Sequence, residues 1–419
     1  MSERLKILIS AYACSPYKGS EPGVGWGFVA ALAKRHELWV IVEEEKFRAD
    51  IEHYLGANPE FSRWVHFFFV KKVRNRRLRK IWPPSYYWYY RRWHQEALDL
   101  AKALHERVGF DLVHQLTMVG FREPGYLWKM RIPFVWGPVG GMGVFPWRFL
   151  PVVGGYGALY YTGYNLFNAW QMRFALRPRK AARSAGVGLI TATPENQLGA
   201  QEYWGCSSSM ICEVGLPPVP AQRPTARKSN EPLRVAWAGL HLPGKALNLA
   251  LHSLARLPKA ITWELHVLGQ GERTRYWQQL AQQLGVAEHC HFAGWLPREE
   301  AIHIMASSHL MLITSLRDLT STVTIEALAL GLPIVCLDHC GFAGVVNDRC
   351  GIKVQVTTPE KVVVGLAEGI ARLANNEALR MQLAEGAVLR AQDFSWDNKA
   401  AAVDEIYRRK LAEYEAIEA

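Results

Sequence analysis

The sequence predicts an α/β protein made of two domains of similar size that face each other across a cleft. The chain has 419 residues, and at about 150 residues per domain this length allows two or three domains. Hydrophobic residues make up 49% and charged residues 21% of the chain, which excludes disordered, collagen-like and coiled-coil proteins. Both halves alternate short apolar stretches with amphipathic ones, and this alternation is typical of parallel strand–helix units.

In the first half, a strand is predicted at 5–10, followed by a glycine-rich loop, GSEPGVGWG, at 19–27. A helix is expected to continue to about residue 35. Runs rich in β-branched and aromatic residues predict further strands, at 37–43, 64–70, 111–116, 133–136 and 186–193.

The second half repeats this pattern. Strands are predicted at 233–240, 262–269, 309–315 and 333–338, and helices at 246–257 and 324–330. A Pro-rich, polar stretch at 215–232 predicts a linker. The expected domains are therefore 1–214 and 233–395, with a final helix at 396–419 that packs back on the first domain.

Cysteine content and the start of the chain predict a reducing, cytoplasmic location. Seven cysteines are too few, and odd in number, for a disulfide framework. The residues after Met1, SERLKILISAY, open a strand and lack the apolar region of a signal peptide.

Positive charge is concentrated in the first half of the chain. Residues 1–205 contain 28 Lys and Arg against 16 Asp and Glu, whereas the remainder contains 21 against 22. This asymmetry indicates an anionic partner for the first half: nucleic acid, a membrane surface or a phosphorylated ligand.

One segment, 71–93, combines this charge with aromatic rings. It has nine basic residues and no acidic one, and seven aromatic residues are interleaved: Trp82, Tyr86, Tyr87, Trp88, Tyr89, Tyr90 and Trp93. The pattern favours contact with the headgroups of an anionic membrane. Two alternatives remain open, a solvated basic face with the rings packed inward and a site for single-stranded nucleic acid.

A second segment, 149–172, carries no charge and is long enough to cross a bilayer. Its Pro, Gly, Asn and Tyr residues exclude a spanning helix, and basic residues follow it directly. We therefore expect the protein to lie on the inner face of the cell membrane, with 71–93 and 149–183 facing anionic lipid and with no nucleic acid bound.

The most specific chemical pattern lies in the second half. Gly239 ends a strand, Lys245 follows at the start of a helix, and Asp318 and Glu326 stand eight residues apart downstream. Ligands of open α/β sheets bind at the carboxyl ends of the strands. There, a lysine and the free amides of a helix start can hold a diphosphate, and an acidic side chain can accept hydrogen bonds from ribose. Together these residues predict a nucleotide-diphosphate site.

These motifs resemble those of glycosyl transferases group 1, the large retaining family four of glycosyltransferases with the GT-B fold. The resemblance is clearest from about 233 to 356 and rests on GLHLPGK (239–245), LGQG (268–271), FAGW (292–295) and DLTSTVTIEALALGLPIV (318–335). It implies two Rossmann-like α/β domains, the first for the acceptor and the second for a nucleotide sugar.

Roles follow from the resemblance position by position. Lys245 would contact the donor diphosphate, Glu326 would hold the ribose, and Asp318 would lie beside the donor sugar. The amides of Ser321 and Thr322 would face the phosphates. Four glycines complete the expected donor site: Gly23, Gly239, Gly269 and Gly271.

The sequence departs from the family pattern at two of these positions. The first acid is Asp318, where the family usually has Glu, and Leu240 stands where an Arg is usual. One phosphate cation is therefore missing, and His241 or an arginine of the first half could replace it.

The first half matches the family less closely. EPGVGW (21–26), which contains Gly23, takes the place of the family's glycine-rich loop, and GPVGG (137–141) is expected to line the acceptor side. DLVH (111–114) resembles the family's Asp-x-x-His strand end, so His114 is a catalytic candidate. Many relatives have a second histidine where this chain has Leu116.

The resemblance implies transfer of a sugar, with retention, from a nucleotide-diphosphate sugar to a lipid-linked or glycan acceptor in polysaccharide or glycolipid biosynthesis. No cofactor and no metal are expected, and the cluster Cys336, His339, Cys340 and Cys350 lacks the spacing of a zinc site. The alternatives are a nucleotide-sugar epimerase of the same fold and a non-catalytic protein that binds membrane or nucleic acid. The sequence does not predict the base, the sugar or the linkage.

Overall fold

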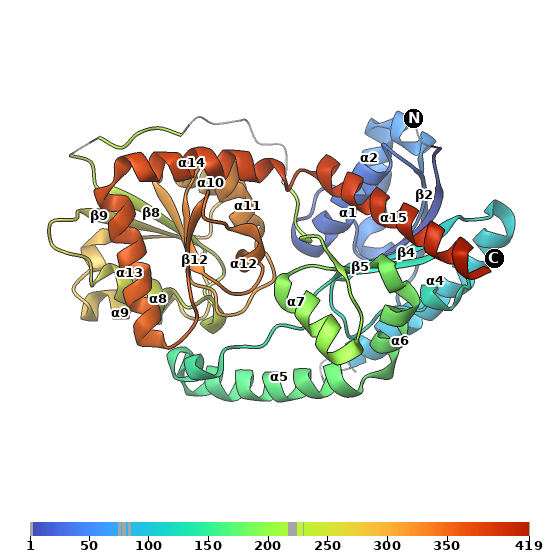
Figure 1. The fold of residues 1–419 in the computed structure, drawn as a ribbon, viewed down its shortest axis with the longest axis horizontal. Helices are drawn as coiled ribbons and strands as arrows, with labels where there is room; N and C mark the ends of the chain where they lie inside the picture. Colours follow the sequence, from blue (N-terminus) through green and yellow to red (C-terminus); the bar gives the residue numbers. More distant parts are fainter. Residues whose placement is uncertain are drawn as a thin grey trace. The chain divides into compact units, whose positions relative to one another are not determined.

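A computed structural model of the chain describes residues 3–73, 77, 81–82, 85–216, 224–228 and 230–418. The chain divides into two compact units (Figure 1). Unit 1 comprises Met1–Met142, Trp170–Gly215 and Trp396–Ala419, and unit 2 comprises Gly143–Ala169 and Leu216–Ser395. The predicted first domain ran without interruption, whereas the structure assigns 143–169 to the unit formed mainly by the second half.

Unit 1 contains a parallel sheet whose described strands follow the order β3-β2-β1-β4-β5-β6-β7. The strands are β1 (Lys6–Ala11), β2 (Glu37–Glu43), β3 (Val65–Val70), β4 (Leu112–Thr117), β5 (Phe134–Val139), β6 (Leu189–Thr191) and β7 (Ser209–Met210). Apolar runs such as Ile7–Ile9 form the buried centre of this sheet. The predicted strand at 186–193 is shorter than expected, because 186–188 form a short 3-10 helix.

Helices of unit 1 cover this sheet. They are α1 (Ser20–Leu32), α2 (Glu44–Ala57), α4 (Ser85–Val108), α6 (Leu176–Ala185), α7 (Pro194–Gly199) and α15 (Trp396–Glu418). Helix α15 packs against α1 and reaches β5, and α4 packs against β1 and β3. The chain passes from unit 2 to unit 1 within one further helix, α5 (Gly154–Phe174).

The glycine-rich segment after β1 is helical, so its prediction as a loop is wrong. Helix α1 begins at Ser20 and includes Gly23, Gly25 and Gly27. A Cβ atom at Gly25 would lie 2.1 Å from the carbonyl oxygen of Ala13, and one at Gly27 would lie 2.2 Å from the ring of Trp396. These glycines therefore allow α1 to pack closely on its neighbours.

Unit 2 contains a second parallel sheet, whose described strands follow the order β10-β9-β8-β11-β12-β13. The strands are β8 (Leu233–Ala238), β9 (Trp263–Leu268), β10 (Cys290–Gly294), β11 (Leu310–Ile313), β12 (Ile334–Leu337) and β13 (Gly351–Val354). The helices are α8 (Leu247–Leu254), α9 (Thr274–Gln283), α10 (Arg298–Ala306), α11 (Thr322–Ala329), α12 (Phe342–Val345), α13 (Pro359–Asn375) and α14 (Glu377–Gln392). Helix α8 is shorter than predicted, and α11 begins two residues earlier than predicted.

The core of unit 2 explains why 143–169 belong to it. Phe145, Phe149, Val153 and Tyr161 are buried in the same apolar cluster as residues of β8, α8 and α13. Phe149 and Val153 lie in the short 3-10 helix η3 (Trp147–Val153), which leads into α5. Burial of several large apolar side chains provides most of the attraction that holds this segment to unit 2.

None of the helices in the described part of the chain combines the length and the apolar character that a bilayer span requires.

Candidate functional site

Both sheets have a point at which the direction of strand addition reverses. In unit 1 this point lies between β1 and β4, and in unit 2 it lies between β8 and β11. Loops that leave the carboxyl ends of two such strands diverge, and the space between them is where open α/β sheets bind ligands. The predicted donor site is therefore expected among the residues that follow β8 and β11.

Lys245 and Asp318 meet at this position in unit 2. Lys245 ends the short 3-10 helix η6 (Pro243–Lys245) after β8, and Asp318 follows β11. Their side chains form an ion pair and are only 17% and 22% exposed. The hydroxyl of Thr314 donates a hydrogen bond to the carbonyl oxygen of Lys245 at 3.0 Å, which anchors the loop to the end of β11.

The segment between β11 and α11 orients the carboxylate of Asp318. The backbone N–H of Leu319 donates to Oδ1 of Asp318 at 3.0 Å, and the N–H of Asp318 itself faces the Sγ of Cys340 at 3.3 Å. Ser321 is the residue before helix α11, and Thr322 is its first residue. Free amides at a helix start attract anions, so the positions predicted for phosphate binding lie on the same loop as Asp318.

The predicted glycines Gly239, Gly269 and Gly271 let two loops cross closely at this edge. Gly269 has φ +116°, and a Cβ atom there would lie 2.1 Å from the carbonyl oxygen of Gly239. A Cβ atom at Gly271 would lie 2.8 Å from the carbonyl oxygen of His241. A larger residue at Gly269 or Gly271 would collide with the backbone of the loop after β8. Glycine at these positions therefore allows the loops after β8 and β9 to lie against each other.

Glu326 is buried and already paired. Its Oε1 accepts hydrogen bonds from the Nε and Nη2 atoms of Arg298 at 3.0 and 2.7 Å. Arg298 is the first residue of α10 and is largely exposed. Sequence reasoning missed Arg298, which has no motif of its own and meets Glu326 only through the packing of α10 on α11.

The cation that the family pattern lacks at Leu240 is not supplied by His241. The ring of His241 is buried beside Trp237 and Trp277, and its Nδ1 lies 2.7 Å from the hydroxyl of Thr274. Burial lowers the pKa of His241 to about 4, so the ring is neutral at pH 7. The expectation that it replaces the arginine is therefore wrong.

A better candidate for this cation is Arg317, which sequence reasoning also missed. Its guanidinium carbon lies 3.6 Å from the ring centroid of Tyr164 in α5. A Cβ atom added at Gly244, which directly precedes Lys245, would lie 3.6 Å from the Cβ of Arg317. Arg317 precedes Asp318 in the chain, so a second cation stands on the loop that carries the predicted site.

In unit 1, His114 is enclosed by protein. It is 0% exposed in the middle of β4, its Nδ1 lies 2.7 Å from the hydroxyl of Tyr407, and its Nε2 lies 2.8 Å from the carbonyl oxygen of Gly137. Burial lowers its pKa to about 4. Both ring nitrogens thus join α15 and β5 to β4, which is a structural role in place of the predicted catalytic one.

Glu21 occupies the reversal point of the sheet in unit 1. It lies in the first turn of α1, and its Oε1 accepts a hydrogen bond at 3.0 Å from the N–H of Val119, which follows β4. Its Oε2 is buried and has no hydrogen-bond partner in the described part of the chain. Burial raises the pKa of Glu21 to about 7. Glu21 belongs to the EPGVGW motif, in which Gly23 and not Glu21 was the predicted site residue.

Gly23 itself lies inside α1 in unit 1, where a Cβ atom would lie 2.7 Å from the carbonyl oxygen of Lys18. The predicted donor residues 239–326 all lie in unit 2. Nothing in the packing of Gly23 points to a phosphate, and its lack of a side chain is explained by this contact.

The basic, aromatic segment 71–93 is split by the fold. Tyr89, Tyr90 and Trp93 are buried, and Lys72 is enclosed by the rings of three tyrosines, with its Nζ 2.9 Å from the hydroxyl of Tyr12. The rings of Trp82, Tyr87 and Trp88 are exposed. Residues 74–76, 78–80 and 83–84 lie outside the described part of the chain. Part of the segment is therefore core, as the inward-facing alternative required.

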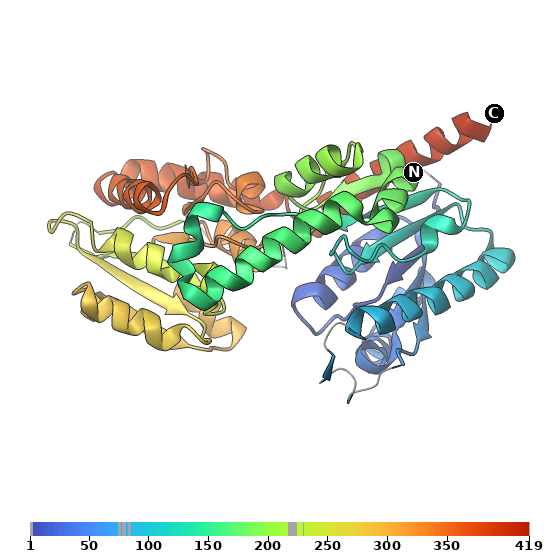
Figure 2. The same cartoon turned by 90° about the horizontal axis from the view of Figure 1, so that it is seen from below.

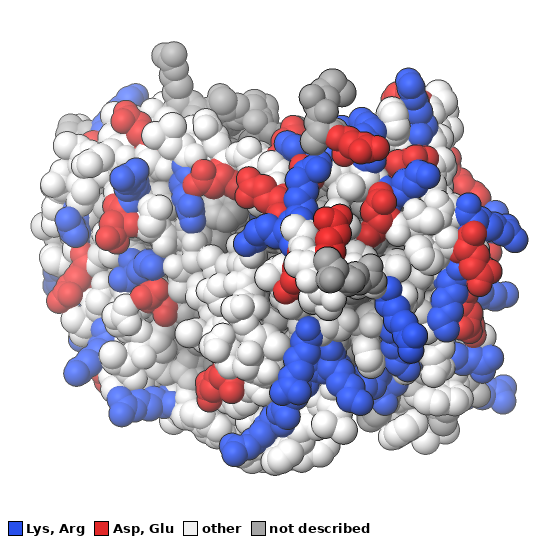
Figure 3. Space-filling view, turned by 45° about the vertical axis from the view of Figure 1, so that its right-hand side comes forward, with Lys and Arg blue, Asp and Glu red and all other residues white. Residues whose placement is uncertain are grey.

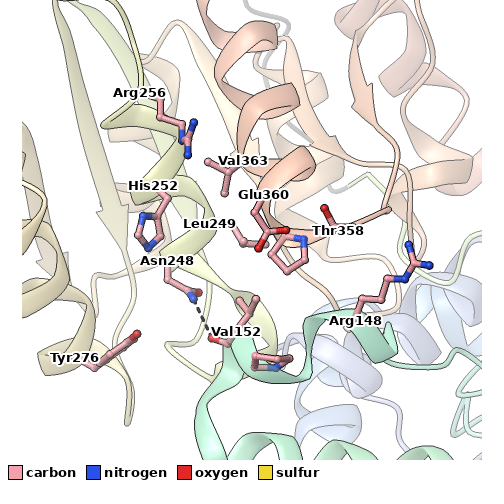
Figure 4. Close-up of a pocket in the computed structure, with 12 residues that line it drawn as sticks. Arg148, Val152, Asn248, Leu249, His252, Arg256, Tyr276, Thr358, Glu360 and Val363 are labelled. Atoms are coloured by element: carbon pink, nitrogen blue, oxygen red, sulfur yellow. Dashed lines mark hydrogen bonds between the residues drawn. The ribbon is translucent and has the colours of Figure 1, made fainter.

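A pocket of 660 Å³ lies elsewhere in unit 2 (Figure 4). It is bounded by η3, α8 and the start of α13, and Asn248 donates a hydrogen bond at 2.9 Å to the carbonyl oxygen of Val152 at its edge. Arg148, Arg256 and Glu360 bring both signs of charge to an otherwise largely apolar surface. Since Lys245, Asp318 and Glu326 are not among its lining residues, this pocket is separate from the predicted donor site.

Comparison with known proteins identifies a family whose model matches the second half of the chain. The family model for glycosyl transferases group 1 matches residues 220–390, which include Lys245, Asp318 and Glu326. A D-inositol 3-phosphate glycosyltransferase from Corynebacterium urealyticum is 28% identical over 138 residues, 33% of this chain and 32% of that protein. The lipopolysaccharide glucosyltransferase WaaG of Escherichia coli K12 is 29% identical over 146 residues, 34% of this chain and 37% of that protein. The matches thus span about a third of the length of these curated relatives.

Similarity to solved structures covers the fold as a whole. The Anabaena protein Alr3699/HepE, solved in complex with UDP, superposes with a TM-score of 0.59 over 96% of this chain and 98% of its own, at 13% sequence identity. Identity at this level shows the shared fold alone. Residues 220–390 therefore match the family model of glycosyl transferases group 1, and the chain has the GT-B fold of two Rossmann-like units.

Proposed function

We propose that this protein is a glycosyltransferase that binds a nucleotide-diphosphate sugar in unit 2 and transfers the sugar to a hydroxyl of a lipid-linked or glycan acceptor in polysaccharide or glycolipid biosynthesis. The observation that carries the proposal is the pairing of Lys245 with Asp318 beside the start of α11, at the reversal point of the sheet in unit 2. This pair lies within the segment that matches the family.

Transfer of the sugar requires positive charge beside the leaving diphosphate. When the bond from the anomeric carbon to the diphosphate breaks, negative charge grows on the phosphate and positive charge on the sugar. Lys245, the amides at the start of α11 and Arg317 would stabilise the phosphate charge, because donors fixed in place need no reorganisation during the reaction. Asp318 would accept a hydrogen bond from a hydroxyl of the sugar.

The donor must separate the ion pair as it binds. In the structure, the ammonium of Lys245 faces the carboxylate of Asp318. A diphosphate would take over this ammonium, and a sugar hydroxyl would donate to the carboxylate that is released. Each side chain thus exchanges its protein partner for a ligand partner of matching charge or polarity, so that neither is left buried and unpaired.

The acceptor would bind at the corresponding edge of the sheet in unit 1. Glu21 is placed there, and one of its carboxylate oxygens has no hydrogen-bond partner among the described residues. A hydroxyl of the acceptor could donate to this oxygen. We infer retention of anomeric configuration from the family resemblance, with the leaving phosphate taking the acceptor proton. We infer also that Lys245 and the helix amides do the work that a metal ion does in other transferases.

The donor base is proposed from a structural neighbour. The Anabaena protein has been solved with UDP and with UDP-glucose, so we propose a uridine nucleotide as the first donor to test. His114 has no part in this proposal, since both of its ring nitrogens are occupied within unit 1.

The test replaces Lys245 and measures transfer. Lys245→Ala should reduce turnover of a UDP-sugar by about a hundredfold or more, in the range seen when one charge-stabilising donor is removed. The control is Lys259→Ala, which removes an exposed lysine of the same unit and should leave turnover unchanged.

Normal turnover in folded Lys245→Ala would overturn the assignment. Consumption of the nucleotide sugar at the same rate with and without any acceptor, with an isomeric nucleotide sugar as product, would replace the transferase with an epimerase.

A further inference from the structure

Helix α5 exposes a row of large apolar and aromatic side chains and buries two asparagines on its opposite side. The residues of its buried side are Gly157, Tyr161, Asn165, Asn168 and Met172. The large exposed residues, which we call the α5 stripe, are Tyr156, Leu159, Tyr160, Leu166, Phe167, Trp170 and Phe174. With 3.6 residues per turn, the stripe falls within about a third of the helix circumference, opposite the buried side.

The two asparagines show that this orientation is built into the packing. The side chain of Asn165 both accepts from the N–H of Phe145, at 2.9 Å, and donates to its carbonyl oxygen, at 2.8 Å. Asn168 donates to the carbonyl oxygen of Gly143 at 3.2 Å. Tyr161 stacks on the ring of Phe145, with centroids 4.1 Å apart. Rotating α5 to bury the stripe would break all of these contacts.

Exposed apolar side chains on one side of a helix are typical of a surface that binds a partner. Soluble proteins rarely expose a large continuous apolar patch unless it binds something. Figure 2 shows α5 as one unbroken helix. At about 1.5 Å per residue, the 21 residues of α5 make a rod about 30 Å long.

The charged residues that follow α5 and the aromatic rings of the α5 stripe indicate which partner binds there. The segment 149–172 has no charged residue, and exposed basic side chains follow directly: Arg173, Lys180 and Arg183. Figure 3 shows the Lys and Arg side chains on one face of the molecule. Tyr and Trp rings with cations at their border are typical of the interface of an anionic bilayer.

We propose that α5 lies in the plane of an anionic membrane, with the α5 stripe inserted at the level of the headgroups and the following basic residues facing lipid phosphates. The helix anchors the protein on the membrane without crossing it, and this role would place the enzyme beside a lipid-linked acceptor. That last step rests on the proposed function, whereas membrane binding by α5 does not.

The test measures binding of the full chain to vesicles. Leu159 and Leu166 are 74% and 61% exposed in the stripe, so Leu159→Ser with Leu166→Ser should leave the fold intact. On vesicles of phosphatidylcholine mixed with phosphatidylglycerol, this double variant should bind at least about tenfold more weakly. Each substitution removes the free energy that a leucine side chain gains when it moves from water into lipid. The matched control is Leu198→Ser with Leu389→Ser, which removes two leucines of similar exposure, 68% and 66%, from α7 and α14.

A second pair of variants separates α5 from segment 71–93. Trp82→Ser with Trp88→Ser removes two exposed rings of that segment and should reduce binding much less than the α5 variant. Arg173→Glu with Arg183→Glu should weaken binding to the mixed vesicles and remove most of its dependence on salt.

Unchanged vesicle binding of the α5 variant, or an equal loss in the leucine control, would overturn the proposal. Absence of vesicle binding in the native protein, together with a dimer that the α5 variant abolishes, would assign the stripe to a second copy of the chain. UDP binding, measured on the same samples, should be equal in all variants, so that a failure of the donor site is distinguished from a failure of α5.

Discussion

The histidines that the sequence placed near the chemistry, His114 and His241, are both enclosed by protein. Burial lowers the pKa of each to about 4, because a positive charge is costly without water around it. Each ring also has a fixed hydrogen-bond partner, Tyr407 for His114 and Thr274 for His241. A sequence motif shows that a histidine is present but not whether water or ligand can reach it.

The charged residues of the site also show that a sequence motif reveals only some of the groups that meet in the fold. Lys245, Asp318 and Glu326 could be predicted as site residues from their spacing, because all three follow strands of one sheet. Arg298 and Arg317 were not found, because neither is part of a recognised motif. Arg298 begins α10 and meets Glu326 only in the folded unit, whereas Arg317 directly precedes Asp318.

Glu21 gives a prediction that depends on pH. Burial raises its pKa from 4.5 to about 7, so between these values the folded protein holds a proton that the unfolded chain has lost. The free energy of unfolding should therefore fall as the pH rises from about 4.5 to 7. Glu21→Gln keeps the neutral form, and above pH 7 it should be more stable than the native protein by an amount on the order of 1–3 kcal/mol.

Urea unfolding at several pH values measures this difference. Subtracting the two profiles removes the contribution of the buried histidines, which both proteins share. Glu60→Gln, at an exposed position, should leave the profile unchanged. A difference between native protein and Glu21→Gln that does not vary from pH 4.5 to 7 would show that Glu21 is charged in the fold.

At the level of elements, the strands were predicted better than the segments that connect them. A strand in a parallel sheet is buried on both faces, so its apolar run is visible in the sequence. The segment 19–27 was predicted as a loop because of its glycines, yet it begins α1. Gly27 is needed because the ring of Trp396 packs on it, and that contact joins residues from opposite ends of the chain.

Gly269 provides a prediction about the loops that shape the donor site. Gly269→Ala would force a side chain into a left-handed backbone conformation, with φ +116°, and place its Cβ 2.1 Å from the carbonyl oxygen of Gly239. We expect a loss of at least roughly 1–3 kcal/mol of stability from the strained backbone. Binding of a uridine nucleotide should weaken as well, because the ends of β8 and β9 must move apart.

The control for this prediction is Gly56→Ala. Gly56 lies in α2, and an added Cβ would meet no atom within 4 Å beyond its own stretch of the helix. This substitution should stabilise the protein by about 0.5–1 kcal/mol, since Gly in a helix costs that much relative to Ala. Thermal unfolding of the two variants tests both signs at once, and a stable Gly269→Ala would contradict the crossing of the loops.

On the scale of the whole molecule, each unit has its own sheet and its own core. The proposed donor site lies within unit 2, so a bound nucleotide should stabilise that unit directly. At about a hundred times its Kd, a ligand that binds only the folded state adds about 2.7 kcal/mol. Calorimetry with UDP, GDP and ADP should show one responder, with the increase confined to the transition of unit 2 if the units unfold separately.

Lys245→Ala should lose most of this increase, whereas Lys259→Ala should keep it. If no nucleotide raises any transition of the native protein, the donor site does not exist in the form proposed. A nucleotide other than UDP as the responder would correct the base and leave the site unchanged.

The sequence alone determined the two α/β halves, most strands of both sheets and the segment that matches glycosyl transferases group 1, whereas β7, β10 and β13 were not predicted. These features depend on local apolar runs and on short motifs, which a chain displays in order. Tertiary structure alone decided that 143–169 pack on the second half, that His114 and His241 are enclosed, and that α5 exposes its apolar side. Burial is the reason, because it depends on which distant segments cover a residue, and that information is absent until the chain has folded.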